Sequence, residues 1–173
     1  MHLIAFVVAL LVFPFLPGGV AQAQAQVKDW MEYAYPDRSF TVHFPAEPRI
    51  EPTSYQGTEG RAFEARVYSV TLEGRVFKLT VVELPEAGTN GDAHVSHAVK
   101  ILTDGNQIKL DIPHRIRQTY GRQLAVARAD GGFSYLAVFV HKQRLYKLEG
   151  TALTAGGEAE VDAMIFHQSL DLT

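Results

Sequence analysis

The sequence predicts one α+β domain in which an antiparallel sheet of six or seven strands packs against two or three helices. Runs in which apolar and polar residues alternate, as they do in half-buried strands, recur along the chain. Short turn sequences join most of these runs, and connections of hairpin length make neighbouring strands antiparallel. Two other segments repeat their apolar residues every three or four positions, which is typical of helices that cover a sheet.

The first half of the chain predicts three strands. Alternation over residues 40–44 predicts the first strand, which Pro45 ends. Residues 49–60 are rich in Pro, Gly, Ser and Thr, so we expect a loop there. Residues 61–72 and 75–84 follow as two long β-rich runs, and the two residues between them predict a tight hairpin.

A helix is expected from Asp92 to about Thr103. Asp92 supplies the side-chain acceptor that the unpaired N–H groups of a first helical turn require. The apolar residues at helical spacing form one stripe and are Val95, Ala98, Val99 and Leu102.

The second half of the chain predicts a meander and a closing helix. The predicted strands are residues 114–119, 122–129, 133–141 and 144–152. Residues 158–170 predict the closing helix, and we expect Val161, Ile165 and Phe166 to face the sheet.

Residues 1–25 have the layout of a secretory signal peptide. The apolar run Ile4–Leu16 precedes an alternating Ala-Gln segment, which predicts cleavage after Ala23 or Ala25. The run is shorter than the roughly 20 residues that span a bilayer as a helix. No Lys or Arg precedes it, so an N-terminal membrane anchor is the alternative. After cleavage we expect residues 26–173 to form a single domain without a stable membrane span. We expect this domain to be periplasmic or secreted in a bacterium.

Composition and missing motifs narrow the function. The chain has no cysteine, which excludes disulfides and thiolate zinc sites, and a net charge of −3, which argues against a nucleic-acid binder. The hydrolase signatures G-x-S-x-G and H-E-x-x-H and a phosphate-binding P-loop are absent. We therefore expect neither an enzyme nor a cofactor.

One motif suggests a family. Residues 40–48 read Phe-Thr-Val-His-Phe-Pro-Ala-Glu-Pro. This resembles the F-x-V-x-F-P-x-x-P opening of PsbP-like domains, which include the extrinsic P subunit of the photosystem II oxygen-evolving complex and small exported bacterial proteins. The closing segment, residues 166–172, also resembles that family. The resemblance implies a PsbP-like fold and a binding or assembly module without a common catalytic residue, and it implies no photosynthetic role.

The helix expected at residues 92–103 carries a candidate metal site. His94 and His97 are three positions apart and lie on one side of a helix, and Asp92 could supply a third ligand. The simpler interpretation is a pair of solvent-exposed or rim histidines beside the apolar stripe.

The charges of the second half are segregated. Residues 109–147 contain eight Lys or Arg and two Asp, whereas residues 148–173 contain five acidic residues and no Lys or Arg. Such a distribution steers anionic partners to one side of a protein. The candidate partner-binding residues are Arg115, Arg117, Tyr120 and Arg122, although a solvated strand face explains the same pattern.

Two functions remain at this point. The first is an exported, non-catalytic module that binds a protein partner, such as an envelope protein or another anionic partner, or that assists an envelope assembly. The alternative is a periplasmic carrier of a small ligand or metal that uses a cleft between the sheet and the helices. The oligomeric state stays open.

Overall fold

The computed structural model describes residues 30–85 and 91–173, so the predicted signal peptide lies outside the described residues. The strands are β1 (Met31–Tyr35), β2 (Phe40–Phe44), β3 (Arg49–Gln56), β4 (Ala62–Leu72), β5 (Arg75–Glu83), β6 (Gln107–Ile116), β7 (Thr119–Ala127), β8 (Phe133–His141), β9 (Arg144–Ala152) and β10 (Asp171–Leu172). The helices are α1 (Gly91–Thr103) and α2 (Gly157–His167), with short 3-10 turns η1 (Pro36–Arg38) and η2 (Thr58–Gly60).

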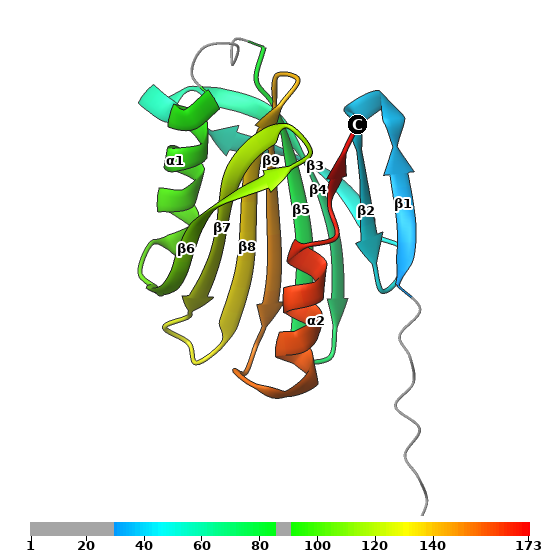
Figure 1. Ribbon diagram of the computed structural model, residues 1–173, viewed down its shortest axis with the longest axis vertical. Coiled ribbons are helices and arrows are strands. Elements are labelled where there is room, and N and C mark those ends of the chain that lie inside the picture. The colour runs from blue at the N-terminus through cyan, green and yellow to red at the C-terminus, as the bar shows by residue number, and fades with distance from the viewer. Residues whose placement is uncertain (1–29, 86–90) are drawn as a thin grey trace, which may run out of the picture.

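The strands form two antiparallel sheets (Figure 1). The large sheet has seven strands in the order β3-β4-β5-β9-β8-β7-β6, and the small sheet has three in the order β1-β2-β10. The predicted α+β class, with a seven-stranded antiparallel sheet and two helices, is confirmed. In the described part of the chain, no helix has both the length and the apolar character that crossing a bilayer requires.

Each face of the large sheet has its own core. We call the two faces the α2 face and the α1 face. The small sheet and α2 cover the α2 face, where the central buried residues are Phe40, Val42 and Phe44 of β2, Phe77, Leu79 and Val81 of β5, Tyr146 and Leu148 of β9, and Phe166 of α2. Helix α1 covers part of the other face with its predicted stripe, and Val95, Ala98 and Val99 are buried as expected. Burying one such apolar side chain contributes about 1.5–3 kcal/mol.

The expected loop at residues 49–60 is wrong over most of its length. Residues 49–56 form β3, which pairs with β4 from Arg49 opposite Ser69 to Gln56 opposite Ala62. β3 is an edge strand, where a proline such as Pro52 is tolerated because one side of the strand needs no ladder donor. The turn-rich composition therefore reflected an edge position and not a loop.

The strand expected at residues 114–119 is also misplaced. β6 begins at Gln107, and the turn to β7 falls at Arg117 and Gln118 instead of at Tyr120 and Gly121. Arg117 takes a left-handed backbone conformation at φ 51°, which an arginine rarely adopts. Because turns favour glycine at such a position, the sequence pattern predicts the turn at Gly121, later in the chain than it lies.

Helix α2 turns a different side to the sheet than its apolar residues suggest. Val161 and Ile165 are 49% and 43% exposed, whereas Ala163 and Phe166 are buried. The reason lies in β9: a Cβ at Gly150 would stand 2.3 Å from the carbonyl oxygen of Ala163. The helix backbone thus approaches the sheet closely, and small Ala163 must face it. The expected helix to residue 170 also ends earlier, at His167.

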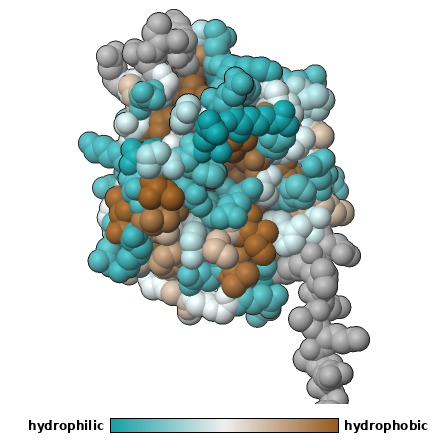
Figure 2. Space-filling view, in the orientation of Figure 1, coloured by the Kyte–Doolittle hydropathy of each residue, from teal (hydrophilic) through white to brown (hydrophobic). Residues whose placement is uncertain are grey.

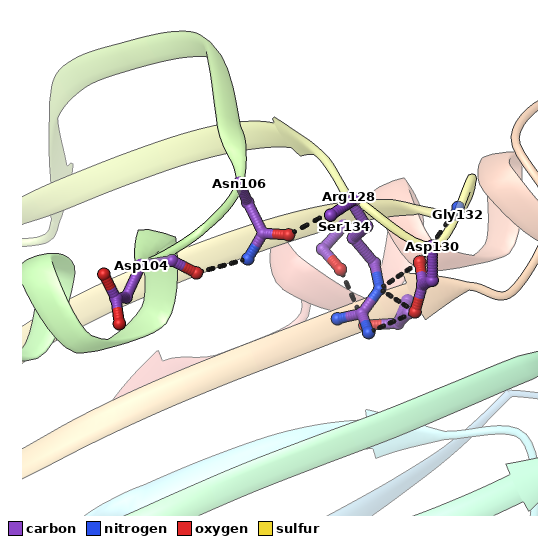
Figure 3. A network of polar contacts seen from close by, with 8 residues as sticks. Asp104, Asn106, Arg128, Asp130, Gly132 and Ser134 are labelled. Atoms are coloured by element: carbon purple, nitrogen blue, oxygen red, sulfur yellow. Dashed lines mark hydrogen bonds and ion pairs between the residues drawn. The ribbon is translucent and has the colours of Figure 1, made fainter.

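A polar network ties the β7–β8 turn to the connection between α1 and β6 (Figure 3). The Arg128 guanidinium donates to Asp130, with 2.6 Å between Nη2 and Oδ2, and the Gly132 N–H donates to Asp130 Oδ1 at 3.1 Å. Asn106 Oδ1, from just before β6, accepts the Ala129 N–H at 3.1 Å. These bonds hold the start of the edge strand β6 against the sheet.

Candidate functional site

The β6–β7 hairpin forms one edge of the large sheet. Its strands pair with Leu110 opposite Ala125 and Ile112 opposite Gln123, after a register shift between Ile108 and Leu110. A shifted register and a proline, here Pro113, are features that edge strands use to avoid indiscriminate pairing with other chains. The hairpin therefore offers its side chains, more than its free backbone edge, to a partner.

One side of this hairpin is apolar and open. The ring of His114 lies 5.8 Å from that of buried Phe139 on the α2 face, and residues two and four positions earlier in a strand share that face. These residues are Ile112 and Leu110, which are 40% and 42% exposed. They are open because α2 packs mainly over β5, β8 and β9 and reaches β7 at Gln123, which contacts His167.

Helix α2 adds apolar side chains on the same face. Val161 and Met164 border a hollow beside Tyr135 of β8, which pairs with Ala125 of β7. Figure 2 shows one group of apolar side chains over β6 and another over α2 on this face of the molecule. We call Leu110, Ile112, Val161 and Met164 together the apolar shelf.

The tip of the hairpin carries two of the predicted partner-binding residues. Tyr120 is 70% exposed, the most exposed large apolar or aromatic side chain in the described residues. Arg115, opposite it in the ladder, places its guanidinium carbon 5.8 Å from the centre of the Tyr120 ring. Such a cation–π pair keeps both side chains extended and near one another.

The other two predicted arginines are engaged within the protein. Arg117 donates to both carboxylate oxygens of Asp171, at 2.9 and 2.5 Å, and this hydrogen bonding raises the pKa of Arg117. Arg122 donates to Asp111, with 2.9 Å from Nε and 2.5 Å between Nη2 and Oδ2. The structure therefore brings Arg115 and Tyr120 together but does not join Arg117 and Arg122 to them as one free basic patch.

The histidines of α1 do not gather a third ligand. His94 is buried against the ring of Phe63, at 6.0 Å, so the expected exposed or rim position is wrong for it. Burial, with a smaller contribution from His97, lowers the pKa of His94. His97 Nε2 lies 3.1 Å from the Gln56 carbonyl oxygen. Over residues 30–85 and 91–173, no three His, Asp or Glu side chains lie together as a metal site would require, and exposed Asp92 does not complete one.

The cleft expected between the sheet and the helices is shallow. The hollow beside the start of α2 has a volume of about 240 Å³ and is lined by Tyr135, Glu160 and Met164, among others. The Tyr135 hydroxyl donates to Glu160 Oε1 at 3.1 Å, which occupies the polar groups of this hollow. It therefore offers a small ligand few free partners.

Sequence reasoning missed the apolar shelf. The alternation of Ile108, Leu110 and Ile112 with charged residues was a strand signal, but Pro113 directs attention to a later start. The α2 part was missed because Val161 was assigned to the buried side of the helix. Both errors concern which side of an element is covered, and that depends on its neighbours.

Comparison with known proteins gives one clear finding about the fold. Neither a protein-family profile nor a curated protein sequence matches the chain. Among solved structures, the chain is similar to cyanobacterial PsbP (CyanoP) from Synechocystis sp. PCC 6803, determined in solution. The identity is 9%, the TM-score is 0.56, and the match covers 87% of this chain and 96% of that one. This chain therefore has the PsbP-like fold that its residues 40–48 suggested.

Proposed function

We propose that this protein is an exported, non-catalytic module that binds a protein partner through the β6–β7 hairpin and the apolar shelf. The observation that carries the proposal is the position of Leu110 and Ile112 on the edge strand β6, where they are 42% and 40% exposed. Exposed apolar side chains that cluster in this way mark interaction surfaces more often than chance exposure does. The PsbP-like fold supports the non-catalytic part, since the family it resembles consists of binding and assembly modules.

The charges around the shelf indicate the chemistry of the partner. On β6, exposed Lys109 directly precedes Leu110, whereas exposed Arg115 points to the opposite face of the sheet from Leu110 and Ile112, and neither cation makes an ion pair within the described residues. A partner that covers the shelf and also reaches round the free edge of β6, with an apolar centre bordered by Asp or Glu, would bury the apolar side chains and meet these cations. Tyr120 at the hairpin tip lies on the same face as Arg115 and suits the part of the interface beyond the β6 edge, because tyrosine and arginine are enriched where interfaces derive most of their affinity.

Site-specific photo-crosslinking in the intact envelope of the host tests the proposal. A photoreactive residue replaces Leu110 in one variant and Tyr120 in another, and a third carries it at exposed Thr154, away from the hairpin. We expect one discrete crosslinked product from the first two positions and none from the third. Equal labelling from all three positions, or none from the hairpin, would contradict the proposal.

A variant that introduces negative charges into the shelf tests the same surface by a different route. Leu110→Glu combined with Ile112→Glu should abolish the Tyr120 crosslink while the unfolding temperature stays that of the unmodified protein, because both side chains are already open to water. The matched control is Met31→Glu, which changes a side chain of similar exposure, 48%, on β1. A crosslink that survives the double change would rule out the shelf as the binding surface.

A further inference from the structure

A polar cleft lies at the other end of the molecule, where β1 and η1 meet the strands β3 and β4. Two hollows of about 320 and 270 Å³ adjoin one another there, because both are lined by Arg38 and Arg66. We call them together the inter-sheet cleft. The Tyr146 hydroxyl holds η1 in place by donating to the Arg38 carbonyl oxygen at 2.7 Å. The walls of the cleft are thus ordered parts of both sheets.

One guanidinium group of the cleft has no hydrogen-bond or ion-pair partner among the described residues. Arg38 and Arg144 share one carboxylate, with 2.5 Å from Arg38 Nη1 to Glu83 Oε1 and 2.9 Å from Arg144 Nε to Glu83 Oε2. Arg66 of β4 lines both hollows and makes no hydrogen bond or ion pair within residues 30–85 and 91–173. A guanidinium presents its donors in a planar fork that matches a carboxylate, so Arg66 is free to bind one.

The side chain of Tyr68 lies beside these arginines. Tyr68 is 1% exposed and lines the smaller hollow, and its hydroxyl makes no hydrogen bond in the part of the chain that the structure describes. The hydroxyl oxygen of Tyr68 is not fully enclosed, unlike that of Tyr55, so a ligand in the hollow can reach it. Burial raises the pKa of Tyr68, while the nearby charges of Arg38, Arg66 and Arg144 lower it and that of Glu83 raises it. The hydroxyl is therefore protonated at neutral pH and can donate to an anion.

The remaining lining selects the kind of anion. The aromatic ring of Tyr35 and the apolar side chains of Pro36 and Ile50 form the wall of the smaller hollow. The carboxylates of Asp37, Glu64 and Glu83 line one hollow or the other. Arg38 and Arg144 pair with Glu83, whereas Asp37 and Glu64 repel an anion, and they repel a ligand with two negative charges more strongly than one with a single charge. A ligand with one negative charge and an apolar body can contact the arginines and the apolar wall together.

We propose that the inter-sheet cleft binds a small organic acid whose carboxylate is held by Arg66 and the Tyr68 hydroxyl and whose apolar body rests on Tyr35 and Ile50. The site lies on the β3–β4 side of the large sheet, opposite the β6–β7 edge, so it does not depend on the proposed partner surface. The combined volume of the hollows is in the range of ordinary small-molecule sites.

Calorimetric titration of the purified protein with benzoate tests the proposal. Benzoate carries one carboxylate on an apolar ring, so we expect saturable binding at one site. Methyl benzoate lacks the charge, and inorganic phosphate carries more charge and no apolar body, so both should bind at least about ten-fold more weakly. Phosphate that binds as tightly as benzoate would overturn the proposed ligand class.

Two variants and one control locate the site. Arg66→Ala should weaken benzoate binding at least about ten-fold, since a charge-assisted fork is lost. Tyr68→Phe should weaken it several-fold, because only the hydroxyl is removed. Arg49→Ala removes an exposed arginine that pairs with Glu51 on the opposite face of β3 and should leave binding unchanged. Unfolding temperatures confirm that each variant is folded; unchanged affinity in folded Arg66→Ala would refute the proposal.

Discussion

Replacing Gly150 by alanine should force α2 away from the large sheet. The new Cβ would lie 2.3 Å from the carbonyl oxygen of Ala163 and 2.9 Å from its carbonyl carbon, whereas ordinary contact begins at 3.4 Å. The obstructing atoms belong to the helix backbone, which cannot rotate aside as a long side chain would. The helix must therefore shift by about 1 Å, because that is the shortfall in separation.

The cost of this shift follows from overpacking. Additional methyl groups in well-packed sites cost about 1–3 kcal/mol, and a backbone obstacle places Gly150→Ala near the upper end, at about 3 kcal/mol. In a domain of this size each kcal/mol lowers the unfolding temperature by about 2–4 °C, so the expected decrease is about 6–12 °C.

The only tryptophan of the chain reports the same shift. Trp30 stacks on Phe166 of α2 at 6.4 Å and meets Phe77 of β5 at 5.3 Å. Displacement of the helix should expose Trp30 and move its fluorescence emission to longer wavelength before unfolding. The control is Gly91→Ala, whose Cβ would meet only the Val140 side chain at an ordinary 3.6 Å. If Gly150→Ala unfolds at the temperature of this control with unchanged emission, the close approach of α2 is refuted.

Three further predictions concern buried polar groups. Asp162→Ala should cost about 3 kcal/mol in urea unfolding, because it removes the nearest carboxylate from the mostly buried guanidinium of Arg75, which keeps Glu158 at 3.9 Å and the Glu73 carbonyl oxygen at 3.3 Å. A cost below about 1 kcal/mol would show that this ion pair does not hold α2. Burial lowers the pKa of His167 below 6.5, so neutral His167 contributes its full stability above that pH, and this contribution is lost as the pH falls through the lower pKa of the folded state. His167→Gln should therefore flatten the decline of the urea midpoint over that pH range. An unchanged slope of the midpoint against pH would contradict this expectation. Lys147→Met should raise the unfolding temperature, because the cost of burying the Lys147 charge, which lowers its pKa, exceeds the gain from its cation–π contact with the Tyr55 ring at 5.1 Å. A lower unfolding temperature would show that the cation–π contact contributes more than the burial costs.

Local patterns predicted the central strands and α1 well. Residues 133–141 and 144–152 were assigned with the bounds of β8 and β9, because alternation and turn residues there agree with a position inside the sheet. The stripe of Val95, Ala98 and Val99 likewise predicted the buried side of α1. The motif at residues 40–48 led to the correct fold because its aromatic residues build the core between the two sheets.

The errors occurred where a neighbour from elsewhere in the chain decides the outcome. Pro52 and Pro113 suggested breaks, yet both stand in edge strands, and whether a strand lies at an edge depends on the order of the whole sheet. The buried side of α2 depends on Gly150, one strand earlier in the chain, whose missing Cβ admits the helix backbone.

The candidate sites divide in the same way. The sequence by itself determined the α+β class, the absence of cysteine chemistry and the presence of Arg115 and Tyr120 at one hairpin. Only the tertiary structure decided that Arg117 and Arg122 are paired with Asp171 and Asp111, since those partners lie far along the chain or across a ladder. The apolar shelf and the inter-sheet cleft likewise exist only in the folded protein. Exposure and charge pairing are properties of surfaces that distant segments form together, whereas local periodicity describes one segment at a time.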